Sequence, residues 1–268
     1  MGSDIPDDTR IGTAAIAAAL VDARRNRVAL TAFPGEPPQD LTSAYAVQDS
    51  ALGIWNKRIG GWKVGRINAP DDARLGANRL AGPIFADSIV DAESAEPPMP
   101  VFTGGFAAGE AEFMLRLAPP AGATAMPADD AETLAWIDAV RIGIEIASSP
   151  YAAINDDGPC VTISDQGNNA GLVLGLPVAR ELWPRIAEIE VETLVDGQSV
   201  GTATTATILD GPLGAVRFLL GNLASRGIVP EAGWWISSGA VTGVHPVAVG
   251  QQVAARFAGI GEVRCRIT

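Results

Sequence analysis

The feature that most constrains the fold of this chain is a succession of short segments, from about residue 105 onward, in which apolar and polar side chains alternate. Alternation of this kind is typical of strands that turn one face to a core and the other to solvent. Asp196 and Gly197, between two of these segments, form a dipeptide typical of tight hairpin turns. The segments predicted as strands are 110–118, 139–147, 189–194, 200–209, 234–238, 253–257 and 262–267.

Helical patterns precede these strands and occur once among them. Residues 14–27 are rich in alanine and place their larger apolar side chains on one face. A second helix is predicted to begin with Thr42 or Ser43 as its N-cap and to end before Gly60. A leucine-rich stripe over residues 213–223 predicts a further helix. We therefore predict an α+β fold.

The composition is that of a chain with a sizeable core. Of its 268 residues, 47% are hydrophobic and only 19% are charged, which excludes a disordered chain. No internal repeat or low-complexity tract divides the sequence. We expect a single domain over residues 1–268, with a mainly helical N-terminal part at 1–75 and a mostly β catalytic body at 76–268.

The charge balance and the first residues narrow the class of partner. A formal net charge of -12 argues against nucleic acid, which binds to basic surfaces. Residues 1–8 are acidic, and the first apolar run, 11–21, is too short for a membrane span. We therefore expect neither a signal peptide nor a membrane partner. The sequence favours a soluble, cytoplasmic protein that acts on a small molecule.

The scarcity of cysteine and histidine restricts the metal chemistry. Cys160 and Cys265 cannot form a disulfide framework, and the single imidazole, His245, cannot build a histidine-based metal cluster. A metal bound by this chain therefore needs oxygen ligands.

Glu110 and Glu112 are the first candidates for such ligands. On the predicted strand 110–118, alternate residues such as Phe113 form an apolar face, so the two glutamates project side by side from the opposite face. Carboxylates placed in this way repel each other unless a cation neutralises them. The alternative interpretation is a pair of glutamates on a solvated strand edge.

Glu145 is the third candidate, because it is the only charge in the apolar stretch 142–147. A carboxylate in such a strand is costly unless it is paired or bound to a metal. Three glutamates from two strands favour a hard, oxygen-preferring divalent cation such as Mg²⁺ or Mn²⁺. The alternative for Glu145 is a salt bridge to Arg141 or to a neighbouring strand.

Lys63 lies in a glycine-rich segment, Gly-Gly-Trp-Lys-Val-Gly, over residues 60–65. Glycines allow a ligand or another backbone to approach closely. A lysine that is partly desolvated there can act as a proton shuttle. In the alternative interpretation, the stem of Lys63 packs on Trp62 and its ammonium group reaches water.

Two further patterns do not carry a function by themselves. Ser199 lies in a G-x-S-x-G pattern, and Asp210 and His245 follow it in the order found in α/β-hydrolases. That motif needs a strand followed by a helix, whereas Ser199 follows a hairpin signal and leads into a strand. We interpret His245, beside Pro246, as a residue of a turn.

Six short segments, among them those that contain Lys63 and the three glutamates, occur in order over essentially the whole chain. Together they resemble the 2-keto-4-pentenoate hydratase family of the fumarylacetoacetase superfamily. The segments are 45–49, 61–65, 110–113, 145–146, Asp165 with 171–175, and 238–247.

The resemblance implies a fold and a site. The implied fold is an α+β arrangement like the C-terminal part of fumarylacetoacetase, with mixed β-sheets curled into a roll and with N-terminal and flanking helices. The implied site holds Mg²⁺, or Mn²⁺, on Glu110, Glu112 and Glu145, with Lys63 and Asp165 as catalytic residues. The resemblance also implies a homo-oligomer.

The implied activity is that of a hydro-lyase in aromatic or related catabolism. A 2-oxo acid can chelate the metal through its carboxylate and its 2-oxo oxygen, and water can then add to the conjugated double bond of a 2-hydroxy-2,4-dienoate to give a 4-hydroxy-2-oxo acid. The chain departs from the family in two places. No acidic residue occurs in 76–83, around Arg79, and residues 166–169 read Gln-Gly-Asn-Asn instead of Asn-Ala-Ser-Ser.

Three alternatives to hydration stay open. The first is decarboxylation of a 2-oxo-3-enedioate, which uses the same chelation. The second is hydrolysis of a C–C bond in an acylpyruvate, for which His245 is the only imidazole base. The third is a non-catalytic partner subunit, against which the intact set of three glutamates and Lys63 argues.

Overall fold

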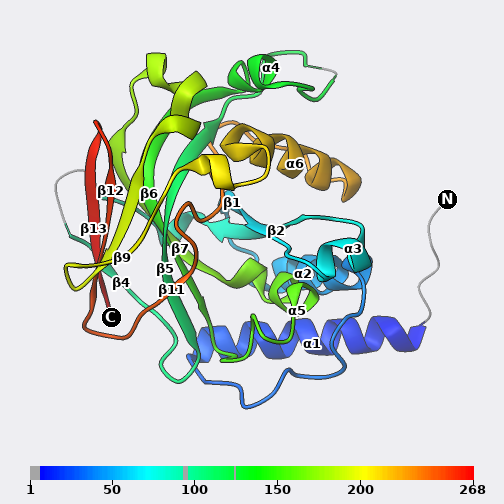
Figure 1. Cartoon of the computed structure of the whole chain (residues 1–268). Coiled ribbons are helices and arrows are strands. Elements are labelled where there is room, and N and C mark those ends of the chain that lie inside the picture. Colours follow the sequence, from blue (N-terminus) through cyan, green and yellow to red (C-terminus); the bar gives the residue numbers. More distant parts are fainter. Residues whose placement is uncertain (1–6, 93–95, 124) are drawn as a thin grey trace.

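The computed structural model describes residues 7–92, 96–123 and 125–268 (Figure 1), so part of the acidic start, residues 1–6, lies outside the described residues. Within the described residues the strands form two sheets. The larger has the order β2-β1-β10-β5-β6-β7-β3, with β11 paired to β5, and the smaller has the order β4-β13-β12-β8-β9. The strands are β1 Ile59–Arg66, β2 Arg79–Phe85, β3 Ile89–Asp91, β4 Pro98–Met99, β5 Phe106–Leu117, β6 Ile137–Ser149, β7 Asn169–Pro177, β8 Val191–Val195, β9 Gln198–Ala203, β10 Trp235–Ser237, β11 His245–Pro246, β12 Gln252–Phe257 and β13 Gly261–Ile267.

The helices cover the larger sheet from two sides. In Figure 1, β1 and β2 run between α6 above and the helices α2 and α5 below, and α1 lies along the lower edge of the molecule against α2. None of the helices in the described ranges combines the length and the apolarity needed to cross a bilayer. The helices are α1 Asp7–Asn26, α2 Leu41–Trp55, α3 Asp71–Leu75, α4 Asp130–Leu134, α5 Pro159–Ser164 and α6 Gly211–Ser225.

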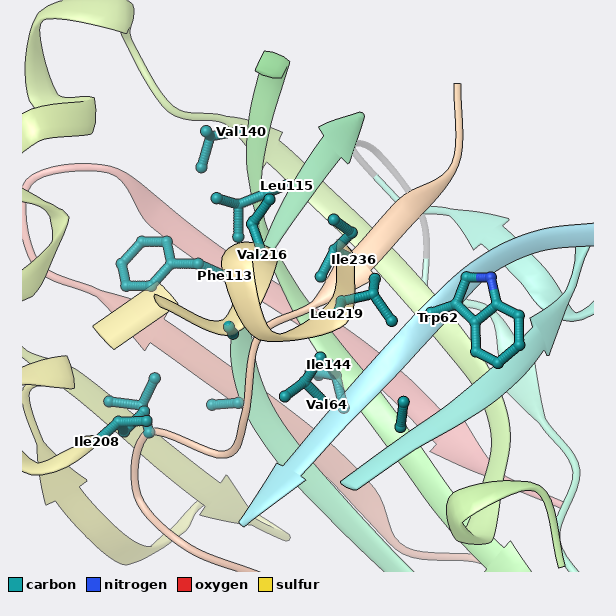
Figure 2. Packing of buried hydrophobic residues seen from close by; sticks show 14 of the residues in the cluster. Trp62, Val64, Phe113, Leu115, Val140, Ile144, Ile208, Val216, Leu219 and Ile236 are labelled. Carbon is teal, nitrogen blue, oxygen red and sulfur yellow. The ribbon is translucent and has the colours of Figure 1, made fainter. Parts of the chain in front are cut away.

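The main core lies on one face of the larger sheet. Phe113 of β5 packs edge-on against Phe257 of β12 in the smaller sheet, with ring centroids 5.0 Å apart. Farther along the same face, Val216 and Leu219 of α6 pack near Ile236 of β10 (Figure 2). Because successive side chains of a strand alternate between faces, the residues next to Phe113 point to the opposite face, which carries the candidate site.

The predicted strands are all present, with shifted ends. Asp196 and Gly197 form the turn between β8 and β9, and both adopt the positive φ angles that such a hairpin needs. The predicted strand 200–209 is wrong in its second half, because β9 ends at Ala203 and a 3-10 turn, Thr205–Thr207, follows. The α+β class is confirmed.

The predicted N-cap of the second helix is wrong, whereas the prediction that the helix ends before Gly60 is confirmed. Asp40, not Thr42 or Ser43, is the N-cap of α2, and its carboxylate accepts a hydrogen bond from the Ser43 amide. The helix ends at Trp55 because Asn56 adopts a left-handed conformation, well before Gly60. The glycine-rich segment around Lys63 instead forms β1, a strand that the sequence did not predict.

Candidate functional site

Strand pairing gathers the predicted site residues on one face of the larger sheet. Glu110 of β5 lies directly opposite Glu145 of β6, and Glu112 lies opposite Gly143. On the other side of β5, β10 connects this row to β1, where Lys63 lies opposite Ser237. Neighbouring strands of one sheet are about 5 Å apart, so side chains on the same face of adjacent strands contact each other.

The three glutamates form a compact carboxylate cluster. One oxygen from each of Glu110, Glu112 and Glu145 lies within 4.8 Å of the others. Glu112 and Glu145 are completely buried and Glu110 is 6% exposed. The interpretation of Glu110 and Glu112 as a solvated edge is therefore wrong. Glu145 does not pair with Arg141, which pairs with Asp91. The other half of that alternative is borne out, because Glu145 forms an ion pair with Lys63 of another strand, β1.

In Glu112 and in Glu145, one carboxylate oxygen accepts hydrogen bonds and the other has no hydrogen-bond partner. Glu112 Oε2 accepts hydrogen bonds from Ser237 Oγ at 2.5 Å and from the Gly239 amide at 2.8 Å. Glu145 Oε1 accepts a hydrogen bond from Asn169 Nδ2 at 2.8 Å. Glu112 Oε1 and Glu145 Oε2 are buried without any hydrogen-bond partner. Buried carboxylate oxygens in this state are costly unless a cation binds them, so the donor set fits a hard divalent metal.

The cluster is short of positive charge. Burial raises the pKa of Glu110 to about 7, with Lys63 opposing the rise and Glu145 adding to it. Burial and the two neighbouring carboxylates also raise the pKa of Glu112 well above its ordinary value. Three carboxylates that face one ammonium group would gain from a divalent cation, which removes the repulsion that raises these pKa values.

Lys63 is part of the cluster. Its side chain is 8% exposed, and its Nζ lies 3.5 Å from Glu145 Oε1. Burial alone would lower the Lys63 pKa, but the negative charges of the three glutamates outweigh burial and raise it. The interpretation of Lys63 as an ammonium group in water is therefore wrong, and the group is held as a proton-bearing cation beside the carboxylates.

A cavity of about 860 Å³ opens onto the cluster. Lys63 and Glu110 line it, whereas Glu112 and Glu145 lie beneath its surface. Arg79 also lines the cavity, is buried, and forms an ion pair with Asp210. Residues 76–83, which contain no acidic residue, thus contribute the Arg79 cation to the cavity wall.

The structure does not bring Asp165 into the cavity. Its carboxylate accepts hydrogen bonds from Arg24 Nε at 2.5 Å and from Ser149 Oγ at 2.6 Å. It follows α5 directly and precedes the 3-10 turn η2, Gln166–Asn168, whose last two residues line the cavity. This geometry places Asp165 behind the site, where it holds the chain and does not face the cluster.

His245 and Ser199 do not form a hydrolase site. Asp210, the acid of that pattern, pairs with Arg79 and Arg217, and Ser199 is exposed on the β8–β9 hairpin. His245 Nε2 lies 2.9 Å from Thr242 Oγ1, and partial burial lowers the His245 pKa. Thr242 lines the cavity, so the imidazole lies one hydroxyl group away from it.

Sequence reasoning missed several residues that complete the site. Ser237 lies in the short predicted strand 234–238, and nothing in that segment marks a hydroxyl as a partner of Glu112. Asn169 is one of the departures from the resembling family, but its contact with Glu145 has no local sequence signal. Arg24 lies on a surface-type helix pattern, and only the tertiary structure shows that it is buried.

Comparison with known proteins supports the wider resemblance. No protein-family model matches the chain. Over 140 residues, it is 27% identical to the 4-oxalocrotonate decarboxylase of Pseudomonas putida and 28% identical to that of Pseudomonas sp. strain CF600. The matched stretch is 50% of this chain and 51% of either relative, so the chain matches about half the length of these curated relatives.

Solved structures align over more of the chain. The 4-oxalocrotonate decarboxylase of Pseudomonas putida G7, complexed with magnesium and adipate, aligns with a TM-score of 0.77 at 23% identity, over 97% of this chain and 98% of that one. Fumarylpyruvate hydrolase of Pseudomonas aeruginosa, in complex with Mn²⁺ and pyruvate, aligns with a TM-score of 0.57 at 14% identity, over 79% and 90% of the two chains. The fold predicted from the resemblance, that of fumarylacetoacetase-like enzymes, is confirmed, and the hydratase branch stays a prediction.

Proposed function

We propose that this protein is a divalent-metal-dependent lyase that acts on an unsaturated 2-oxo acid. The observation that carries the proposal is the pair of buried, unpartnered oxygens on Glu112 and Glu145, next to Glu110 and Lys63 at the base of a cavity. Similar proteins with the same fold are complexed with magnesium, calcium or manganese, which agrees with a Mg²⁺ or Mn²⁺ site here.

Glu110, Glu112 and Glu145 would hold the metal, and the metal would act as a Lewis acid on the carboxylate and 2-oxo oxygens of the substrate. Lys63 is the acid of the reaction. In the metal-free site the glutamates raise its pKa and keep it protonated. The charge of a metal on those glutamates would oppose this rise, so that the proton could be donated as negative charge accumulates on the substrate. The three glutamates and Lys63 are buried, and the lower dielectric constant there strengthens these charge interactions.

Two lyase reactions use this arrangement. Decarboxylation of a 2-oxo-3-enedioate breaks the bond to the distal carboxylate, and its electron pair moves through the conjugated system to the 2-oxo oxygen. CO₂ leaves, and a proton from Lys63 completes the 2-hydroxydienoate. This reaction needs only charge stabilisation and one proton donor, and the relatives named above are decarboxylases. We place it first for that reason.

Hydration of a 2-hydroxy-2,4-dienoate is the second candidate, favoured by the six segments that resemble the hydratase family. Lys63 would move a proton from the 2-hydroxyl group to the terminal carbon, which converts the dienoate to the conjugated 2-oxo-3-enoate. Water would then add with its hydroxyl group on C4 and a proton on C3, and a metal held by the three glutamates would supply polarisation of the 2-oxo oxygen. Acylpyruvate hydrolysis would need a base that activates water, and the nearest imidazole, His245, is separated from the cavity by Thr242.

The test is proton NMR of the products formed with Mg²⁺ or with EDTA. One tube contains 2-oxohex-3-enedioate and a second contains 2-hydroxypenta-2,4-dienoate. Metal-dependent formation of the dienoate in the first tube establishes the decarboxylase, and metal-dependent formation of 4-hydroxy-2-oxopentanoate in the second establishes the hydratase. Turnover that is equal with EDTA, or absent in both tubes, contradicts the proposal.

Glu112→Gln and Glu181→Gln are the matched variants for this assay. Glu112 is buried in the cluster, whereas Glu181 is exposed outside it. Each variant therefore removes one negative charge, the first within the site and the second away from it. We expect Glu112→Gln to lose turnover by at least about a hundredfold and Glu181→Gln to retain it. If Glu112→Gln is as active as the wild type, the assigned site is wrong.

A further inference from the structure

We infer that Asn169 is a positioning residue that sets which oxygen of Glu145 is available to a metal, and that Arg24 of α1 holds Asn169 in place. The inference rests on the metal site of the proposed function. It goes beyond that function because it assigns a task in the site to the N-terminal helix and to a turn that contains no ligand.

The first step is the contact between Asn169 and Glu145. Asn169 begins β7, which pairs with β6, and its Nδ2 donates to Glu145 Oε1 at 2.8 Å. Lys63 Nζ approaches the same oxygen at 3.5 Å. Oε1 is therefore occupied from two sides, and the carboxylate is oriented with Oε2 as its unpartnered atom. Asn169 is itself only 4% exposed, so no water competes for this hydrogen bond from bulk solvent.

The second step is the support that Arg24 gives to Asn169. The Arg24 guanidinium is buried and donates from Nη1 to the Asn169 carbonyl at 3.0 Å. From its other nitrogens it donates to the Asp165 carboxylate and to the Ser148 carbonyl at the end of β6. One side chain thus connects the strand that carries Glu145 with the start of the strand that carries Asn169.

The third step is the shape of the chain between Asp165 and Asn169. Gln166, Gly167 and Asn168 all have positive φ angles, of 59°, 64° and 65°. Gly167 and Asn168 tolerate this conformation, whereas the side chain of Gln166 disfavours it, so the surroundings have to hold the turn at Gln166. Arg24 binds both ends of the turn. It donates to the carboxylate of Asp165, which precedes the turn, and to the carbonyl of Asn169, which follows the turn.

The test measures Mg²⁺ binding to the free protein by calorimetry and Mn²⁺ binding by electron paramagnetic resonance. Asn169→Leu keeps the branched shape of the side chain and removes its donor, whereas Asn169→Ser keeps a shorter donor. We expect Asn169→Leu to weaken Mg²⁺ binding about 10- to 100-fold and to change the Mn²⁺ spectrum, with Asn169→Ser between it and the wild type.

Arg24→Lys keeps the positive charge but loses the guanidinium group that binds both ends of the turn. Arg25→Lys is the matched control on the same helix. Arg25 is exposed and donates to the Ile54 carbonyl, away from the site. We expect Arg24→Lys to weaken Mg²⁺ binding several-fold and to raise the metal concentration needed for half-maximal activity more than it lowers kcat. Arg25→Lys should bind as the wild type does.

Each outcome decides between the two claims. If the wild type binds Mg²⁺ and both Asn169 variants bind it equally well, the role of Asn169 is overturned while the metal site stands. If only Arg24→Lys binds as the wild type does, the part assigned to Arg24 is overturned. If the wild type itself does not bind Mg²⁺ or Mn²⁺, the proposed metal site fails together with this inference. Circular dichroism of each metal-free variant separates a lost contact from a lost fold.

Discussion

The role of Glu145 could be predicted from the sequence only in part. A lone charge in an apolar strand predicts a partner or a ligand, and the structure confirms that the carboxylate is buried among other charged groups. The sequence could not say which oxygen is bound, because Asn169 and Lys63 reach it from other strands. The separation between a bound oxygen and a free one exists only in the folded sheet.

Glu112→Gln in the metal-free protein is expected to raise the free energy of unfolding at pH 8 while it abolishes Mg²⁺ binding. The raised pKa means that the charged form of Glu112 is unfavourable in the fold, and a neutral amide at this position removes that cost. Urea unfolding of both proteins in EDTA measures the change. A variant that is less stable than the wild type would show that Glu112 is needed for structure in its ionised form.

The pH dependence of metal binding should follow Glu110. Its pKa is raised from 4.5 to about 7 in the metal-free fold, so below that pH a proton competes with the metal for the carboxylate. The same shift stabilises the metal-free fold fully below about pH 4.5, and this contribution is lost as the pH rises through 7. We expect the Mg²⁺ dissociation constant to be at least about tenfold higher at pH 6 than at pH 8, since the raised pKa of Glu112 adds to the effect of Glu110. Calorimetry in two buffers of different ionisation enthalpy measures the affinity and the released proton, and a flat profile would contradict the assignment.

At the scale of elements, the site depends on a close approach between β2 and the turn η2. A Cβ atom at Gly82 would lie 2.2 Å from the Gln166 carbonyl oxygen. At Gly167, which has a positive φ, a Cβ would lie 2.9 Å from Lys63 Cδ. The two glycines therefore let the turn close over Lys63, which explains why that side chain is buried.

Gly82→Ala is expected to destabilise the protein by about 2 kcal/mol or more and to raise the exposure of Lys63, because the turn has to move away. Gly221→Ala is the control. Gly221 lies on α6 with open space around it, so an alanine there should stabilise the protein by up to about 1 kcal/mol. Thermal unfolding compares the two, and the rate at which an amine reagent modifies Lys63 reports on the turn. Equal stability of both variants would rule out the close approach as a constraint.

Strands β1 and β7 were not predicted, and glycines at close approaches are the reason, as they are in this turn. β1 carries three glycines and is buried on both faces near its centre, so it shows neither alternation nor a β-branched run. β7 likewise carries glycines at positions where the backbone meets other groups. β13 was predictable because its buried and exposed residues alternate. β5 was predictable although it is buried on both faces, because glutamates alternate there with apolar residues.

At the scale of the whole molecule, both sheets and α6 share one core, and the carboxylate cluster lies on the opposite face of the larger sheet. A metal that binds only the folded state must stabilise all of it through linkage. The single domain over residues 1–268 and the homo-oligomer stay predictions, and light scattering of the purified protein measures the second.

Saturating Mg²⁺ is expected to raise the free energy of unfolding by about 2.7 kcal/mol when its concentration is a hundred times the dissociation constant. The increase should disappear in Glu145→Gln, which removes a ligand, and should persist in Glu181→Gln. Differential scanning calorimetry over a series of Mg²⁺ concentrations measures the effect. A midpoint that does not move with Mg²⁺ in the wild type would argue against binding to the native state.

The parallel pairing of β1 with β10 has a consequence for the order of events during synthesis. Residues 61–63 lie beside residues 235–237, and Ser237 is the hydroxyl that fixes Glu112. A nascent chain therefore emerges with its lysine and all three glutamates long before the strand that must lie between β1 and β5 exists. Until the ribosome has delivered that strand, the sheet has a gap at its centre, and a chain arrested before residue 235 should be unable to retain the metal.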